Sequence, residues 1–364
     1  MKTFRKFRAT WSLVRLARKA QCRYRTNFLA SFTRARHLCR DARFEPEEAY
    51  RLGLLDPALD TTDLSRYVSR KKLTKLQRAL NPVAWEPLLK NKGIFHRYCV
   101  AHGIAVPKLF ALFFRATPGW VCTGLSPVTR KEWVDVLQSG LPDRFIIKPA
   151  EGSLGRGVRA FSRQGDDFRS SDGKVCSASG LYDSMQTDTG FDSFVIEETL
   201  SNHPDIDAFT GNPCLQTLRI VTVCDAGNCC RTISAQLKMI NGLSVTDNFA
   251  NGMSGNISSS VDLVRGVLNP AHAARPDASG MYSLTEHPLT GRVFSDFTLP
   301  FWEDACALVE TAARHFLPIR TIGWDVALTP EGPVIIEGNF WWNPFNQHSN
   351  MGSVAEILKQ QITG

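Results

Sequence analysis

The sequence predicts an α+β protein built from more than one lobe. Helical patterns dominate the chain before residue 105, whereas residues 106–200 mix short strands with helices. Two β-rich runs follow at residues 215–224 and 231–240, and a hairpin of apolar strands turns at residues 329–332. A chain of 364 residues is long enough to bury a large core and to hold two or three such lobes.

Each helix is predicted from its ends or from the spacing of its apolar residues. A short helix begins at Glu45, with acidic residues in its first turn as the helix dipole favours. Residues 61–90 are mostly helical, and a further helix over residues 92–102 is ended by Gly103. Residues 301–316 form an amphipathic helix before the hairpin.

A polar loop rich in Gly, Asn and Ser is predicted over residues 248–260. Loops of this length often cover a substrate or serve as a lid. We therefore expect this segment to lie beside a functional site.

The N-terminal segment carries the positive charge of the chain. Residues 1–43 contain thirteen Lys or Arg and one acid, a net charge of +12, and because the whole chain carries +8, the remainder carries −4. Phe4, Phe7, Trp11 and Val14 recur at helical spacing, which predicts a basic amphipathic helix. Such a helix either docks its aromatic stripe on the body of the protein or lies on an anionic membrane surface. Nucleic acid is the less expected partner.

Composition and cysteine usage exclude several other classes. No apolar run reaches the length of about 18 residues that would span a membrane. The ten cysteines show neither zinc-site nor disulfide-scaffold spacing, so we expect reduced, mostly buried thiols in a cytosolic protein. The eight histidines are scattered without metal-ligand spacing.

Acidic residues mark the predicted C-terminal hairpin. Residues 329–332, Thr-Pro-Glu-Gly, have the composition of a turn between antiparallel strands. With Glu331 at the tip, Asp325 and Glu337 lie opposite each other, and Asn339 projects from the same face as Glu337. No Lys or Arg lies between Asp325 and Asn339, and two carboxylates with an amide oxygen suit Mg²⁺. The alternative is an ordinary surface hairpin with its acids in solvent.

A glycine-rich loop follows another predicted strand. Residues 144–158 contain a short β-type run that ends at Lys148, then a loop with Gly152, Gly155 and Gly157. Glycines admit positive φ and let backbone N–H groups approach an anion, so the loop can hold phosphates, with Lys148 as an added point charge. The loop is neither a Walker A loop nor a dinucleotide-binding fingerprint. A plain flexible hairpin is the alternative.

A third segment, Phe194-Val-Ile-Glu-Glu-Thr-Leu200, is an apolar strand that ends in two acids. It is predicted to be a hinge whose backbone can hydrogen-bond the edge of an adenine ring. The alternative is a buried strand that runs out to solvent.

The order and spacing of these three segments resemble the ATP-grasp superfamily. The shared pattern is a strand with Lys-Pro-x-Glu-Gly-Ser-x-Gly-x-Gly-Val, then Val-Ile-Glu-Glu, then Asp…Glu-x-Asn, and the resemblance spans about residues 45–345. Within the superfamily, the chain is most similar to bacterial sugar-transfer-associated ATP-grasp proteins, which are related to α-L-glutamate ligases. The narrower similarity is carried by residues 91–99 with 103–107, 217–222, 247–252 and 260–263.

The resemblance implies an ATP-grasp fold, in which two α+β lobes hold ATP between them, after a helical and basic N-terminal segment. It divides the chain into the basic segment 1–43, a helical region 44–105, a nucleotide-binding lobe 106–200 and a metal and substrate lobe 201–364.

The resemblance also implies which residues hold the nucleotide. The phosphates would be contacted by Lys92, Lys148 and Lys238, and the loop 152–157, which includes Ser153, would close over them. Adenine would be held by Glu197, Glu198 and the backbone through Leu200, and the ribose hydroxyls by Asp205. The metal ligands would be Asp325, Glu337 and Asn339, which would bind one or two Mg²⁺, with Mn²⁺ as the alternative ion.

The catalytic cation is expected to be Arg219, facing an acyl-phosphate or its transition state. Many ATP-grasp ligases carry an arginine two residues before the first metal acid, and this chain has Gly323 there. Arg219 is therefore the first choice for the oxyanion-stabilising role and Arg320 the second.

The expected activity is ATP- and Mg²⁺-dependent carboxylate–amine ligation through an acyl-phosphate, on sugar-linked substrates of polysaccharide or glycoconjugate assembly. The alternatives are a kinase-like phosphotransferase on the same fold and a non-catalytic nucleotide-binding adaptor. The expected location is the cytoplasm, with residues 1–43 placed to contact the inner membrane face. Loss of Asp325 or Glu337 is expected to abolish ATP turnover and to leave the fold intact.

Overall fold

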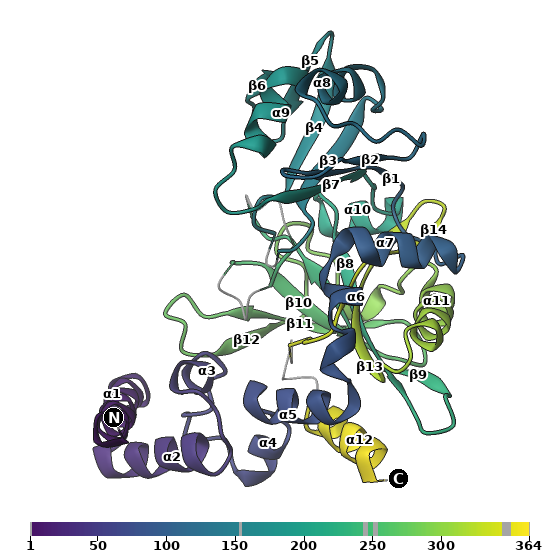
Figure 1. Ribbon diagram of the computed structural model, residues 1–364. Helices are drawn as coiled ribbons and strands as arrows, with labels where there is room; N and C mark the ends of the chain where they lie inside the picture. The colour runs from purple at the N-terminus through teal and green to yellow at the C-terminus, as the bar shows by residue number, and fades with distance from the viewer. Residues whose placement is uncertain (1, 153–154, 243–246, 250–253, 344–350, 364) are drawn as a thin grey trace.

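The computed structural model describes residues 2–152, 155–242, 247–249, 254–343 and 351–363. Within them, two seven-stranded antiparallel sheets form two lobes, and helices precede and cover the sheets (Figure 1). This arrangement confirms the predicted α+β fold. None of the described helices is both long and apolar enough to cross a bilayer.

The upper sheet lies entirely within residues 109–198, inside the lobe expected over residues 106–200. Its strand order is β2-β1-β7-β3-β4-β5-β6. Two helices, α8 and α9, pack on one face through Trp133 and Leu181, which join Phe145 in a buried cluster. The bounds are β1 Leu109–Phe114, β2 Trp120–Val121, β3 Arg144–Pro149, β4 Arg159–Gln164, β5 Asp167–Ser170, β6 Val175–Ser177, β7 Ser193–Glu198, α8 Arg130–Ser139 and α9 Ala178–Gln186.

The lower sheet has the order β12-β11-β10-β9-β8-β13-β14. Leu218 and Ile220 alternate with Arg219 and Val221 along β8, so that the first pair joins the core under α11 and the second pair faces the opposite side. The bounds are α10 Pro204–Thr210, β8 Thr217–Cys224, β9 Cys230–Met239, β10 Ile257–Val261, β11 Leu268–Ala274, β12 Met281–Leu284, η3 Phe294–Asp296, α11 Trp302–His315, β13 Thr321–Thr329 and β14 Gly332–Asn339.

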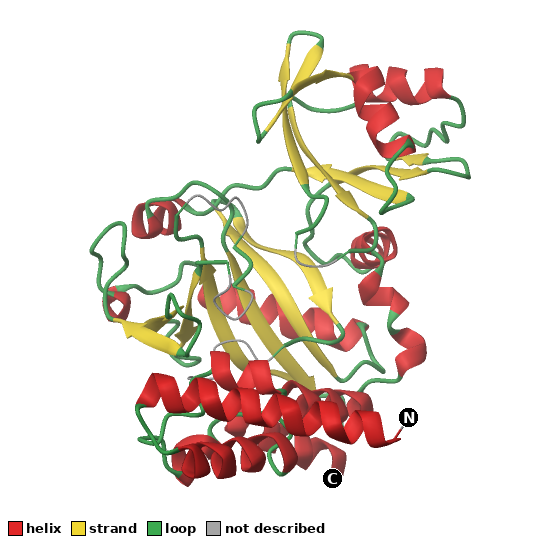
Figure 2. Ribbon diagram, turned by 90° about the vertical axis from the view of Figure 1, so that its left-hand side faces the viewer, coloured by secondary structure: helices red, strands yellow, loops and turns green. Residues whose placement is uncertain are grey.

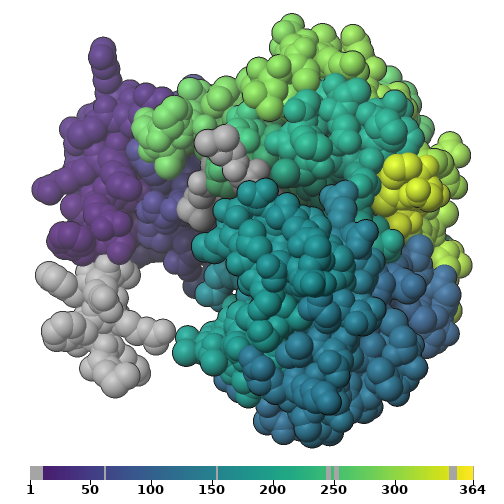
Figure 3. All heavy atoms as spheres, turned by 90° about the horizontal axis from the view of Figure 1, so that it is seen from above, coloured from purple at the N-terminus to yellow at the C-terminus, as the bar shows by residue number. Residues whose placement is uncertain are grey.

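Most of the remaining helices form a layer at the base of the lower lobe (Figure 2), whereas α7 lies at the junction of the two lobes (Figure 1). Seen from above, the N-terminal ones project to one side of the two lobes (Figure 3). The bounds are α1 Lys2–Tyr24, α2 Phe28–Arg40, α3 Pro46–Arg51, α4 Thr61–Ser65, α5 Arg70–Leu80, η1 Val83–Trp85, α6 Pro87–Lys90, α7 Lys92–Ala101 and α12 Met351–Thr363. One hydrophobic cluster extends from Leu13 to Leu55, so the boundary expected at residue 43 falls inside it.

The face by which α1 docks differs from the predicted one. Leu13, Leu16 and Ala20 are buried against α2 and α3, whereas Trp11 is 61% exposed. A stripe of small and aliphatic side chains lets the helices approach more closely than a row of large rings would, which accounts for the difference. Trp11 therefore does not dock on the body, as one of the two alternatives required, although the predicted helix itself is present.

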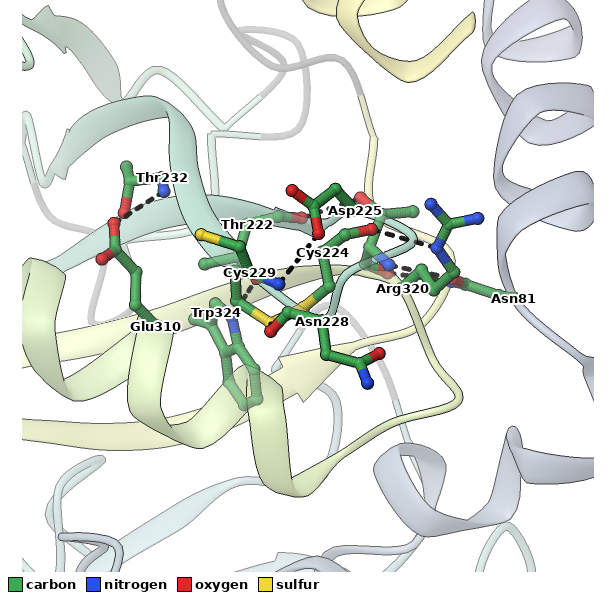
Figure 4. Close-up of a disulfide and its surroundings, with 12 residues drawn as sticks. Asn81, Thr222, Cys224, Asp225, Asn228, Cys229, Thr232, Glu310, Arg320 and Trp324 are labelled. Carbon is green, nitrogen blue, oxygen red and sulfur yellow. Dashed lines mark hydrogen bonds between the residues drawn. A yellow bond between two sulfur atoms is a disulfide. The ribbon is translucent and has the colours of Figure 1, made fainter. Parts of the chain in front are cut away.

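The cysteines also differ from expectation. Cys224 and Cys230 face each other across the turn between β8 and β9 and form a disulfide (Figure 4). Of the free thiols in the described residues, only Cys99 is buried. The prediction that all thiols are reduced is wrong because strand pairing brings together two cysteines whose spacing carries no recognisable motif. The prediction that most thiols are buried is also wrong for the described residues.

The polar loop predicted over residues 248–260 ends earlier than expected. Its last residues belong to β10, whose Ser258 pairs with Lys238 of β9. Residues 243–246 and 250–253 lie outside the described part of the chain.

Candidate active site

The predicted acidic hairpin is present, and a β-bulge between Asp325 and Val326 gives its two acids the expected pairing. β13 and β14 are antiparallel, and Asp325 lies directly opposite Glu337. The amide Nδ2 of Asn339 lies 3.5 Å from Oε1 of Glu337, so the third predicted ligand is on the same side of the sheet. The hairpin itself contains no Lys or Arg between these residues, but the tertiary structure brings cations from three other segments to the acids.

Asp325 is clamped by two basic side chains of neighbouring strands. Nε and Nη2 of Arg219 donate to its two carboxylate oxygens at 2.7 and 3.0 Å. Lys238 Nζ lies 3.2 Å from Oδ1. Burial alone would raise the pKa of Asp325, yet Arg219 and Lys238 hold that pKa well below its ordinary value. Asp325 is therefore ionised at neutral pH, as a metal ligand must be.

Lys238 also contacts Asp247, a residue without an assigned role in the sequence prediction. The distance from Lys238 Nζ to Oδ1 of Asp247 is 3.5 Å. The other oxygen of Asp247 accepts hydrogen bonds from the backbone N–H and the hydroxyl of Thr217, at 2.7 and 2.6 Å. Asp247 thus fixes the lysine and the start of β8 relative to each other.

Lys92 joins the glycine-rich loop to the acidic hairpin. Its Nζ lies 3.3 Å from the carbonyl oxygen of Gly152 and 3.5 Å from Oε2 of Glu337. Its backbone N–H donates to the carbonyl of Ala150 at 2.8 Å, because α7 begins where β3 of the upper lobe ends. In Figure 1, α7 lies at the junction of the two lobes. One side chain therefore contacts segments of both lobes.

The glycine-rich loop itself has the backbone that its composition predicts. Gly155 and Gly157 adopt positive φ of 70° and 76°. A Cβ on Gly157 would lie 2.8 Å from Cγ of Pro149. Both this overlap and the positive φ exclude a larger residue there. Ser153 lies outside the described residues.

Lys148 is held by a buried acid rather than left free. It forms an ion pair with Oε1 of Glu197, and Nε2 of His96 lies 3.0 Å from Oε2 of the same carboxylate. Burial alone would raise the pKa of Glu197, but Lys148 and His96 lower that pKa below its ordinary value. All three side chains are almost fully buried, and they come from β3, β7 and α7.

The predicted hinge connects the two lobes. β7 ends at Glu198, and the backbone N–H of His203 already donates to the carbonyl of Leu328 in the lower sheet. Glu198 accepts a hydrogen bond from the N–H of Lys108 at 3.1 Å, and Leu200 lies in the connection. Asp205 is exposed in the first turn of α10, 3.5 Å from His203. The side chain of Glu197 points into the buried ion pair, and its backbone lies between β1 and β3 in the sheet.

Arg219 belongs to the cluster and Arg320 does not. Arg320 directly precedes β13, roughly 16 Å along the strand from Asp325 at about 3.3 Å per residue. Its Nε donates to the carbonyl oxygen of Cys224 at 3.0 Å, beside the disulfide (Figure 4). The structure therefore does not bring the second choice for the catalytic cation to the cluster, because extended strands separate residues that are near in sequence.

Gly323 leaves room for Trp342 beside the cluster. A Cβ at residue 323 would lie 3.4 Å from Cδ of Arg219 and 2.5 Å from Cβ of Trp342. The first distance is an ordinary contact and the second is an overlap, so the missing side chain makes room for Trp342.

Replacing Gly323 with Ala is expected to lower the free energy of unfolding by about 1–3 kcal/mol, because the added methyl group overlaps Trp342. Denaturant unfolding would measure the loss. Gly180→Ala on α9 is the matched control, since its Cβ would meet Cys176 at an ordinary 3.5 Å. That control should be neutral or slightly stabilising. Equal stability of both variants would contradict the packing argument.

The hairpin suits a hard divalent cation. Asp325, Glu337 and Asn339 bring two carboxylates and an amide oxygen together, and oxygen ligands of this kind fit Mg²⁺, with waters and phosphates completing its shell. Arg219 and Lys238 contact Asp325, and Lys92 contacts Glu337, so a bound metal would share these carboxylates with three cations. The hairpin thus supplies the types of ligand atom that the sequence predicts for Mg²⁺.

Sequence reasoning gave no role to His96 and Asp247, although both lie in stretches that carry the family similarity. Along the chain, His96 is 101 residues from its partner Glu197, and Asp247 is 30 residues from its partner Thr217. A histidine on an otherwise apolar helix and an acid before a polar loop are the signals that could have drawn attention to them.

A family model described as sugar-transfer associated ATP-grasp matches residues 71–360. No protein of curated function matches the chain.

Solved structures resemble the chain at low identity. A biotin carboxylase–βγ-ATP complex from Campylobacter jejuni is 11% identical with a TM-score of 0.44, and the match covers 76% of this chain and 46% of that one. A RimK domain ATP-grasp protein from Sphaerobacter thermophilus is 12% identical with a TM-score of 0.37, at 76% and 68% coverage. D-alanine–D-alanine ligase from Bacillus anthracis is 11% identical with a TM-score of 0.37, at 76% and 66% coverage.

The chain thus spans less than half the length of the biotin carboxylase it matches. The family model, by contrast, accounts for most of the chain and for every segment of the candidate site described above. The protein therefore belongs to the sugar-transfer associated ATP-grasp family.

Proposed function

We propose that the protein is an ATP- and Mg²⁺-dependent ligase that joins a carboxylate to an amine through an acyl-phosphate. The observation that carries this proposal is the position of Lys92, which contacts both the glycine-rich loop and the acidic hairpin. A phosphate chain bound beside it would meet Lys148 of the upper lobe and Lys238 of the lower lobe. Such a ring of cations around two carboxylates favours phosphoryl transfer by positioning and electrostatics.

Each residue has a defined task in this reaction. Lys92, Lys148 and Lys238 would orient the phosphates of ATP, and the backbone of residues 198–200 would hold the adenine edge, with Asp205 near the ribose. Asp325, Glu337 and Asn339 would hold one or two Mg²⁺, which neutralise charge on the transferring phosphoryl group.

Two steps account for the products. An oxygen of the donor carboxylate attacks the γ-phosphorus of ATP, the bond to the β–γ bridging oxygen breaks, and ADP leaves. The amine nitrogen then attacks the acyl carbon, the carbon–oxygen bond to phosphate breaks, and the amine loses a proton. Arg219 would stabilise the negative charge that develops on the acyl oxygens, because its guanidinium is fixed next to Asp325.

A polar acceptor that carries hydroxyl groups is the substrate class we favour. Directly beyond Arg219 in the sheet register lie Gln236 of β9 and Ser260 of β10, and Ser258 donates to Gln236 at 3.2 Å. This row of hydrogen-bonding groups suits a sugar-linked substrate of polysaccharide or glycoconjugate assembly. The family description supports the same class. We place the reaction in the cytoplasm, where ATP is available.

The test is ATP turnover with Mg²⁺ against mixed pools of amino acids, uronic acids and amino sugars, with phosphate release and product mass measured together. Phosphate release with a product equal to donor plus acceptor minus water would support the ligase. ADP formation with an acceptor heavier by one phosphate would replace it with a kinase-like phosphotransferase. Tight ATP binding without turnover across all pools would favour a nucleotide-binding adaptor.

A further inference from the structure

The outward face of α1 carries a row of exposed residues. Trp11, Arg15, Arg18 and Cys22 follow one another at spacings of three and four, which places them on one side of the helix. The opposite side holds the leucines that pack on α2 and α3. This α1 face therefore combines one large apolar ring with arginines and is not used for folding.

The second helix repeats the pattern. On α2, Leu29, Thr33, Arg36 and Arg40 are exposed at the same spacing, and Leu29 is 73% exposed. The opposite side of α2, with Ala35 and Leu38, belongs to the buried cluster. We call the α1 face and this α2 face together the basic helical surface.

The arginines of this surface have no acidic partner in the part of the chain that the structure describes. Within the described residues, Arg15, Arg18, Arg36 and Arg40 form no ion pair with an Asp or Glu. Residues 1–43 carry +12, whereas the rest of the chain carries −4. Self-repulsion among these charges is unfavourable, so the surface is complementary to an extended anionic partner.

The helices are fixed to the lower lobe. Arg23 lies 3.2 Å from Asp277, and it donates to the hydroxyl of Ser279 at 2.8 Å. The hydroxyl of Tyr24 donates to the carbonyl of Ser279 at 3.0 Å. These residues follow β11, in the sheet that carries Lys238. A partner that binds the helices would therefore orient the whole lobe.

We propose that the basic helical surface docks the protein on an anionic lipid bilayer, a function beyond the ligation reaction. Phosphate headgroups would meet Arg15, Arg18, Arg36 and Arg40, while Trp11 and Leu29 enter the boundary between headgroups and acyl chains. Exposed Trp and Leu within a basic face favour lipid over nucleic acid, because their burial in the bilayer interface adds to the electrostatic attraction. The docking would be peripheral and reversible.

The experiment is co-sedimentation of the full chain with vesicles. We expect binding to vesicles of equal parts phosphatidylcholine and phosphatidylglycerol, weak binding to phosphatidylcholine alone, and loss of binding at high salt. The double variant Arg15→Gln with Arg18→Gln should bind the mixed vesicles about 25-fold more weakly, since each basic side chain near an anionic surface contributes about fivefold. Trp11→Ser should also weaken binding.

The matched control is Lys131→Gln with Arg169→Gln, two exposed cations on the upper lobe. It removes the same charge and should bind as the wild type does. ATP turnover without vesicles should be unchanged in all variants, so a failure of docking and a failure of the ligase are distinguishable. Three outcomes would overturn the proposal. They are equal binding to both vesicle types, binding of the mixed vesicles by the double variant as tight as that of the wild type, and binding to duplex DNA but not to vesicles.

Discussion

Replacing Glu337 with Gln is expected to reduce ATP turnover by roughly 10²–10³-fold while the protein stays folded. Glu337 supplies one of the two carboxylates of the hairpin, and its side chain is 33% exposed. The amide keeps the shape of the side chain but removes the negative charge that a divalent cation requires. Initial rates of ADP formation at saturating ATP and Mg²⁺ would measure the loss, and circular dichroism would verify the fold.

Glu331→Gln is the control for this variant. Glu331 stands at the tip of the same hairpin, where one oxygen accepts from the hydroxyl of Thr329 at 3.2 Å, an interaction that an amide oxygen can replace. Turnover should remain as in the wild type. Full activity of Glu337→Gln would refute the metal assignment.

Asp325 would not behave like Glu337, although the sequence predicts the same outcome for both. Its carboxylate is buried between Arg219 and Lys238, so Asp325→Ala leaves two buried cations without their partner. Removing one partner of such a cluster costs about 3–5 kcal/mol. Activity lost in Asp325→Ala would therefore report on folding as well as on catalysis, and Glu337 is the better probe.

Replacing Glu197 with Gln is expected to lower the free energy of unfolding by about 3–5 kcal/mol at neutral pH. The change leaves the buried ammonium of Lys148 without its counter-charge and weakens the contact of His96. Chemical denaturation with a spectroscopic readout would measure the loss in free energy of unfolding. Glu198→Gln, one residue further along β7, is the control, because its side chain is exposed and its contact with the N–H of Lys108 can be made by an amide oxygen.

The ion pair between Glu197 and Lys148 also predicts how stability depends on pH. The pKa of Glu197 is lower in the folded protein than in the unfolded chain, where a glutamate titrates near 4.3. Its contribution is therefore complete above about pH 5 and is lost as the pH falls through the lowered folded pKa. Stability of the wild type should fall more steeply than that of Glu197→Gln below about pH 5. Parallel curves would contradict the assignment.

Local patterns were sufficient for most of the secondary structure and for the acidic hairpin. The observed pairing of Asp325 with Glu337 also needs a β-bulge beside Asp325, which the sequence did not predict. The turn and the alternation around it were predictable because strand pairing across a short turn depends on nearby residues. The glycine-rich loop and the strand over residues 194–198 were predicted for the same reason. The docking face of α1 was not, because it depends on which helices pack against it.

The sequence by itself determined the types of residue that the site contains and the order of its segments along the chain. Only the tertiary structure decided how they are paired. It placed Arg219 and Lys238 on Asp325, Lys148 and His96 on Glu197, and left Arg320 at the far end of β13. These partners lie on different strands and helices, often about a hundred residues apart. Their distances follow from sheet order and lobe packing, which no local sequence pattern specifies.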